Sequence, residues 1–177
     1  METMLIMMVD RPELAERILA RVTDFYLLVN QRCYAICRGM LDYAYFGDDW
    51  SGQNGMLMNP ELWRRTIKPH LARIYGQAKE YGLKVMQHSC GSVRPVIGDL
   101  IEIGADVLDP IQVRAKGMEP GELKRSFGHC LAFHGGIDTE WTLRCGTPAD
   151  VRPEVRERIR VLGDGGGLQQ HAGEARD

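Results

Sequence analysis

His88 and Cys90 are the residues whose types and spacing most clearly suggest chemistry in this sequence. They follow directly on a short apolar run, and residues two apart in an extended chain point to the same side. An imidazole nitrogen and a thiolate sulfur are both good zinc ligands, so the pair could supply half of a metal site. The alternative is a hydrogen-bonded histidine beside a small buried thiol at the end of a strand.

Other polar residues follow three further apolar runs of strand length. In chain order, the ends of the four runs carry Asp48 and Asp49, His88 and Cys90, Asp109 and Gln112, and His134 and Asp138. The carboxyl ends of parallel strands meet at one edge of a sheet, where α/β proteins bind ligands. We therefore expect the residues other than His88 and Cys90 to bind a small-molecule substrate. The alternative is that they are simply polar loop residues.

The elements that must position these residues are read from alternating apolar patterns. Strands are predicted over residues 41–46, 83–87, 105–108 and 130–133, and helices over residues 10–38, 59–82, 95–103, 119–127 and 148–162. Asp10, Asn59 and Thr147 each stand one or two residues before a proline as helix caps. Strand-then-helix units in series predict a parallel sheet with right-handed crossovers.

Composition excludes several classes of protein. With 177 residues, 44% of them hydrophobic and 26% charged, the chain is expected to form one domain. A net charge of −2 without a basic patch argues against binding to nucleic acid or an anionic membrane. We find no apolar run that could span a membrane and no signal peptide. The five cysteines lack the spacing of a disulfide scaffold, which favours a cytoplasmic location.

Three longer blocks of the sequence carry a family resemblance. The chain resembles the uroporphyrinogen decarboxylase superfamily, which includes the methylcobamide:coenzyme M methyltransferases, in the blocks GDDWSGQNGMLMNPELWRRTIKP, GLKVMQHSCGSVRPVIGDLIEIGADVLDPIQ and GMEPGELKRSFGHCLAFHGGIDTEWTLRCGTPADV. The resemblance implies a parallel (β/α)8 TIM barrel. Since a complete barrel needs about 250 residues, this chain is expected to form a partial barrel of about four or five βα units. Residues 1–167 would form that domain, and residues 168–177, which lack a strand pattern, would be a disordered non-family tail.

What the resemblance implies for function depends on the branch of the family. In the methyltransferase branch, a His-x-Cys pair and a further cysteine near the last strand hold zinc, which binds the acceptor thiol, and a corrinoid donates the methyl group. His88 and Cys90 match the pair, but the further cysteine is missing, with His171 as the one substitute in the tail. The resemblance implies zinc as a cofactor and a corrinoid protein as partner, but without the third protein ligand the site should bind zinc poorly.

Three interpretations of function remain open from the sequence. The first is corrinoid-linked methyl transfer to a thiol. The second is metal-free decarboxylation of uroporphyrinogen III in porphyrin biosynthesis, whose family pattern lacks the His-x-Cys pair. The third is a fragment that is inactive alone. Two copies could also associate to complete a barrel, so a homodimer is a further hypothesis.

Overall fold

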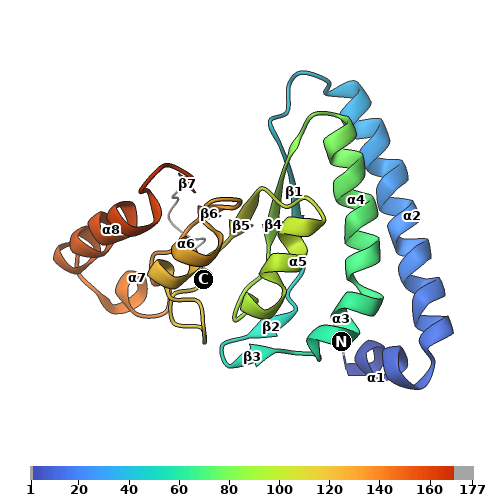
Figure 1. Cartoon of the computed structure of the whole chain (residues 1–177), viewed down its shortest axis with the longest axis horizontal. Coiled ribbons are helices and arrows are strands. Elements are labelled where there is room, and N and C mark those ends of the chain that lie inside the picture. Colours follow the sequence, from blue (N-terminus) through green and yellow to red (C-terminus); the bar gives the residue numbers. More distant parts are fainter. Residues whose placement is uncertain (1, 170–177) are drawn as a thin grey trace.

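The computed structural model describes residues 2–169 and is built around one open, parallel five-stranded sheet (Figure 1). The strands lie side by side in chain order: β1 (Tyr43–Gly47), β4 (Lys84–His88), β5 (Val107–Asp109), β6 (Ala132–His134) and β7 (Leu168–Gln169). Each successive strand is added at the same edge, and helices connect one to the next. This arrangement is part of a (β/α)8 barrel, and it confirms the predicted fold class.

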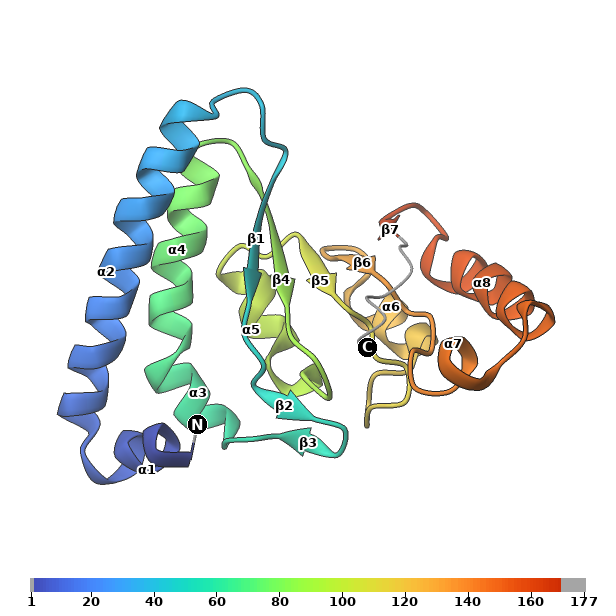
Figure 2. The same cartoon turned by 180° about the vertical axis from the view of Figure 1, so that it is seen from behind.

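The helices lie along the sheet and at its two ends. They are α1 (Glu2–Asp10), α2 (Pro12–Ile36), α3 (Pro60–Thr66), α4 (Lys68–Glu80), α5 (Ile97–Glu102), α6 (Pro120–Phe127), α7 (Thr142–Cys145) and α8 (Pro148–Leu162). A single 3-10 turn, η1 (Arg94–Val96), precedes α5. Both views show α2 beside α4 at one end of the molecule and α8 at the other (Figures 1 and 2).

Two of the three predicted helix caps are present. The side chain of Asn59 accepts a hydrogen bond of 2.8 Å from the Glu61 backbone N–H, and Pro60 begins α3. Thr147 and Asp150 form a reciprocal capping box at the start of α8. The predicted cap at Asp10 is wrong, because Asp10 is the last residue of α1 and Arg11 precedes α2 without a side-chain cap.

The core lies between the sheet and the helices. Val85 and Gln87 of β4 are fully buried on the face toward α4, where Gln87 accepts a hydrogen bond from the Tyr75 hydroxyl. Since side chains alternate along a strand, Met86 and His88 lie on the opposite face. That face is the inner face of the barrel, and it is open at β1, where 45% of Tyr43 and 56% of Tyr45 are exposed.

Strand register aligns the carboxyl ends of the first three strands. Gly47 of β1 pairs with His88 of β4, and His88 pairs with Asp109 of β5. These three residues form one row across the sheet, which we call the cross-strand row. The loops that follow it leave the sheet at the same edge, so their side chains can meet.

Two predicted segments differ from the structure. The helix predicted over residues 59–82 is interrupted at Ile67, because Pro69 lacks a backbone N–H and its ring clashes with an uninterrupted helix. The prediction that no strand begins at residue 168 is also wrong, since Leu168 and Gln169 form β7 by pairing with β6. The rest of the predicted tail, including His171, lies outside the described residues.

Within residues 2–169, none of the helices combines the length and the apolar character needed to cross a membrane.

Candidate metal site at the carboxyl ends of the strands

Asp49, His88 and Cys90 bring three possible metal ligands together after β1 and β4. One donor atom from each lies within 4.8 Å of the others, and no other such group occurs among the described residues. Nε2 of His88 is 3.6 Å from Sγ of Cys90 and 3.6 Å from Oδ1 of Asp49. Zinc bonds of about 2.0–2.3 Å in a tetrahedron place neighbouring donor atoms roughly 3.3–3.8 Å apart. The donor types suit zinc, and the two distances measured from Nε2 of His88 fall within this range.

Asp109 is hydrogen-bonded to the ring nitrogen of His88 that does not face Cys90. Its carboxylate accepts hydrogen bonds from Nδ1 of His88 at 2.9 Å, from the Tyr45 hydroxyl at 3.0 Å and from Nδ1 of His134. Because an ionised carboxylate can only accept, Nδ1 of His88 carries a proton, and Nε2 is the ring nitrogen that faces Cys90 and Asp49 and could bind a metal. A carboxylate behind a ligating histidine is a recurrent arrangement in zinc proteins.

These hydrogen bonds also determine the ionisation of Asp109. Burial by itself would raise the pKa of this carboxyl group, since the charged form is poorly solvated. The hydrogen bonds from His88, His134 and Tyr45 outweigh burial and lower the pKa to about 2. Asp109 is therefore a carboxylate at neutral pH, as its role behind His88 requires.

A short hairpin, β2 (Ser51–Gly52) and β3 (Gly55–Met56), fixes the backbone around Cys90. The Ser51 hydroxyl donates to the Cys90 carbonyl at 2.6 Å, and the Ser92 backbone N–H donates to the Gly52 carbonyl at 2.9 Å. The Cys90 backbone N–H donates to Oδ1 of Asp49 at 2.8 Å. The hairpin thus links the loop after β1 to the loop after β4.

Gly91 is required by this close approach. Its φ of +80° lies in the left-handed region, and a Cβ built there would stand 2.6 Å from the Gly52 carbonyl oxygen. A side chain at this position would push the Cys90 loop away from the hairpin. The glycine after the His-x-Cys pair therefore helps to position the cysteine.

Asp48 and Gln112 lie at the margin of the cluster. The Asp48 backbone N–H donates to the His88 carbonyl at 3.1 Å, and its carboxyl pKa is raised by desolvation and further by the nearby charge of Asp49. Oε1 of Gln112 accepts hydrogen bonds from the Gly91 backbone N–H at 2.8 Å and from Gln53 at 3.0 Å. Gln112 therefore supports the loop that carries Cys90.

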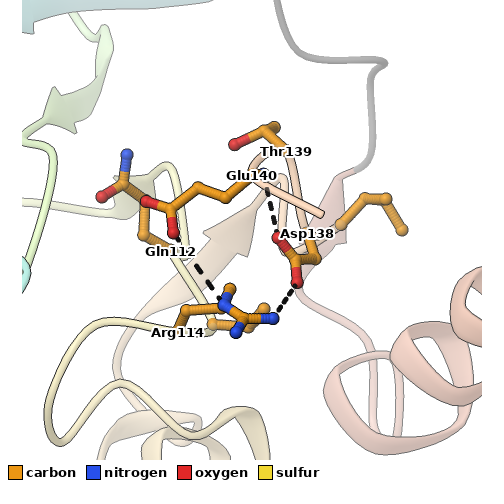
Figure 3. Close-up of a pocket in the computed structure, with 7 residues that line it drawn as sticks. Gln112, Arg114, Asp138, Thr139 and Glu140 are labelled. Atoms are coloured by element: carbon orange, nitrogen blue, oxygen red, sulfur yellow. Dashed lines mark hydrogen bonds and ion pairs between the residues drawn. The ribbon is translucent and has the colours of Figure 1, made fainter. Parts of the chain in front are cut away.

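Asp138 lies apart from the cluster. Figure 3 shows it facing Arg114, with an ion pair of 3.2 Å between the two, and Glu140 on the other side of Arg114 at 3.9 Å. Its other carboxylate oxygen accepts backbone hydrogen bonds from Glu140 and Trp141. The pocket that these residues line has a cavity of about 10 Å³, enough for about one water molecule. Asp138 thus organises its own loop and does not line a cavity of substrate size.

The structure brings most of the predicted site residues together. Asp49, His88, Cys90, Asp109 and His134 form one connected cluster, with Asp48 and Gln112 at its edge. Sequence reasoning missed Tyr45, the hairpin residue Ser51 and Arg114. Tyr45 could have been found, because it lies two residues before Gly47 and so shares the inner face of the sheet with His88. Whether the clustered residues bind substrate or metal remains a prediction.

A parallel sheet with strands in chain order and polar side chains at their carboxyl ends places this chain among the barrel-type α/β proteins. The family described as uroporphyrinogen decarboxylase (URO-D) matches residues 1–172. The chain belongs to this family, and the match extends beyond the domain boundary expected at residue 167.

Among solved structures, the chain is similar to a methyltransferase from Methanosarcina mazei, with a TM-score of 0.76 and 19% sequence identity. The match covers 98% of this chain and 48% of the methyltransferase chain, so this chain spans about half the length of that protein. At this identity, the likeness establishes the fold. No curated protein was found to match the chain.

Proposed function

We propose that Asp49, His88 and Cys90 bind a zinc ion and that the site serves methyl transfer from a corrinoid to a thiol. The proposal rests on the cluster of three donor atoms and on the hydrogen bond from Nδ1 of His88 to Asp109. Asp49 takes the place of the third ligand that the sequence resemblance left missing. A mixed sulfur, nitrogen and oxygen donor set is suitable for zinc.

Each residue of the site has a separate task in this proposal. Asp109 keeps the proton on Nδ1 of His88 and fixes the ring, while Tyr45 and His134 hold Asp109 in place. The hairpin holds Cys90 through its backbone. Zinc, when bound, would stabilise an acceptor thiolate near neutral pH.

The open inner face gives access to this site. Tyr45 is 56% exposed, and its ring centroid lies 6.1 Å from that of His88. A thiol substrate could approach along this face, and the corrinoid would be presented by a partner protein.

Zinc binding is the first test. The purified chain should bind about one zinc ion per molecule, measured by elemental analysis and by competition with a chromophoric chelator. His88→Ala and Cys90→Ala should each lose this zinc, whereas Cys130→Ala, which changes an exposed cysteine outside the cluster, should keep it. Circular dichroism would check that each variant is folded. Unaltered zinc binding in both site variants would contradict the proposal.

Turnover is tested separately, because the chain spans about half of the similar solved structure. Demethylation of methylcobalamin by an added thiol, followed by absorbance, should require zinc and Cys90. Metal-independent loss of carboxylate groups from uroporphyrinogen III would instead support the decarboxylase alternative.

A further inference from the structure

Tyr75 of α4 and Gln87 of β4 form a buried polar pair on the core face of the strand that ends at His88. Both side chains are fully buried, and the Tyr75 hydroxyl donates a hydrogen bond to Oε1 of Gln87. Polar groups in a core cost free energy unless they are hydrogen-bonded, and Val85, two residues earlier on the same face of β4, is apolar. Packing of the sheet against α4 therefore does not by itself require a glutamine and a tyrosine at these positions.

The Gln87 side chain connects this pair to the backbone of His88. Its Nε2 donates to the His88 carbonyl oxygen, which also accepts the Asp48 backbone N–H at 3.1 Å. A carbonyl oxygen has two lone pairs and can accept both hydrogen bonds. Asp49 follows Asp48 directly, and Cys90 lies two residues after His88. The backbone of both segments that carry the candidate ligands is therefore joined at this one oxygen.

Tyr75 determines which way the Gln87 amide points. The His88 carbonyl can only accept, so Nε2 must face it, and Oε1 then faces the Tyr75 hydroxyl, which donates. Burial raises the pKa of this hydroxyl, and the nearby charge of Asp48 raises it further, so the hydroxyl keeps its proton. The Tyr75 ring is stacked on Phe46 of β1, with the ring centroids 5.6 Å apart. A reversed amide would set Oε1 against the carbonyl oxygen, so only one orientation satisfies the pair.

We infer that Tyr75 and Gln87 are positioning residues for the candidate metal site, and that they act through the carbonyl group of His88. The three donor atoms come from two loops, and a working site has to be held to within about 0.5 Å of its productive geometry. A hydrogen bond from the core fixes the backbone from which the imidazole and the thiol project. The bearing of this inference on zinc rests on the function proposed above, whereas the positioning of the backbone does not.

Paired substitutions separate the stability of the fold from the geometry of the site. Tyr75→Phe and Gln87→Leu each leave one polar group unpaired in the core, and each should lower the folded-to-unfolded ratio roughly 5- to 150-fold in urea unfolding. The double variant removes both partners and should recover most of this loss. It still lacks the hydrogen bond to the His88 carbonyl, so the site should remain displaced although the fold is stable again.

Zinc affinity of the folded variants is the first measurement. Competition with a chromophoric chelator should show about tenfold weaker binding by the double variant than by the wild type, as is typical when a contact that supports a metal ligand is removed. The absorbance spectrum of bound Co²⁺ should change for the same reason. Val85→Ala is the matched control, because it removes buried atoms from the same face of β4 without removing a side-chain hydrogen bond. It should keep the affinity and the spectrum of the wild type.

Amide hydrogen exchange tests the positioning without metal. With a chelator present, NMR should show several-fold faster exchange of the Asp48 amide in the double variant than in the wild type and in Val85→Ala. A wild type that binds no zinc, together with this faster exchange, would refute the zinc site and support the positioning of the His88 backbone. Unchanged Asp48 exchange in the double variant would overturn the inference, whether or not zinc binds. Zinc affinity equal to that of a zinc-binding wild type would overturn it as well.

Discussion

The lowered pKa of Asp109 predicts how much this one carboxylate stabilises the fold. Its pKa is about 2 in the folded protein, against an ordinary value of 3.8. Each unit of pKa difference corresponds to about 1.4 kcal/mol, so the ionised carboxylate contributes about 2 kcal/mol to the free energy of unfolding at neutral pH. Only 6% of the side chain is exposed, so solvent screening reduces this value little.

The sign of the pH dependence follows from the direction of the pKa change. Because the folded pKa lies below the unfolded one, the contribution is fully present above about pH 5 and is lost as the pH falls through 3.8 toward 2. Roughly half of it should be lost by pH 3. The substitution Asp109→Asn introduces a side chain that resembles the protonated carboxyl group in shape and cannot ionise.

Urea unfolding of the wild type and of Asp109→Asn at several pH values measures this effect, with a chelator present to exclude bound metal. At pH 7 the variant should be less stable by about 2 kcal/mol, and the difference should fall to about 1 kcal/mol at pH 3. A stability difference that is absent at pH 7, or that stays constant down to pH 3, would refute the reasoning.

Two further substitutions test the surroundings of the cluster. Gly91→Ala should lower the free energy of unfolding by about 1–3 kcal/mol, because Gly91 has a φ of +80° and a Cβ there would contact the Gly52 backbone. The control is Gly98→Ala, in helix α5, where a Cβ would meet open space. In the same urea experiment this control should be neutral or slightly stabilising. Equal effects of the two changes would show that the hairpin contact is unimportant. Tyr45→Phe removes one of the three hydrogen bonds to Asp109 and should lower the free energy of unfolding by about 0.5–1.5 kcal/mol at pH 7. It should also raise the pKa of Asp109, which an NMR titration would measure. An unchanged pKa would mean that the hydroxyl does not contribute.

Much of the fold could be predicted from the sequence because its signals are local. The strand that ends at His88 and the cap at Asn59 each depend on a few neighbouring residues, and both are found in the structure. The break at Ile67 was missed because an apolar helical pattern continues through it, although Pro69 is a local signal that could have revealed it. Leu168 and Gln169 form a strand only by pairing with β6, which a local pattern does not contain.

The candidate site was predicted in part for the same reason. His88 and Cys90 could be recognised from their spacing, and the edge of a parallel sheet explains why Asp109 and His134 lie near them. That Asp49 lies with His88 and Cys90 depends on the side-chain conformation and on the hairpin, whose two-residue strands leave almost no pattern. Conversely, the helix predicted over residues 10–38 leaves apolar side chains such as Val22 and Phe25 exposed, because periodicity shows which residues share a face and does not show what covers it.

The cross-strand row of Gly47, His88 and Asp109 gives the candidate site a place in the order of folding. Asp49 follows β1, and helices α3 and α4 separate it from His88 and Cys90, so these three residues meet only after β1 and β4 have paired in register. Asp109 joins them when β5 pairs with β4. Such distant parallel pairings form slowly compared with local helices. If the cluster binds a metal, metal uptake would then lag behind helix formation. The time course of the absorbance of bound Co²⁺ would therefore measure how fast the sheet assembles.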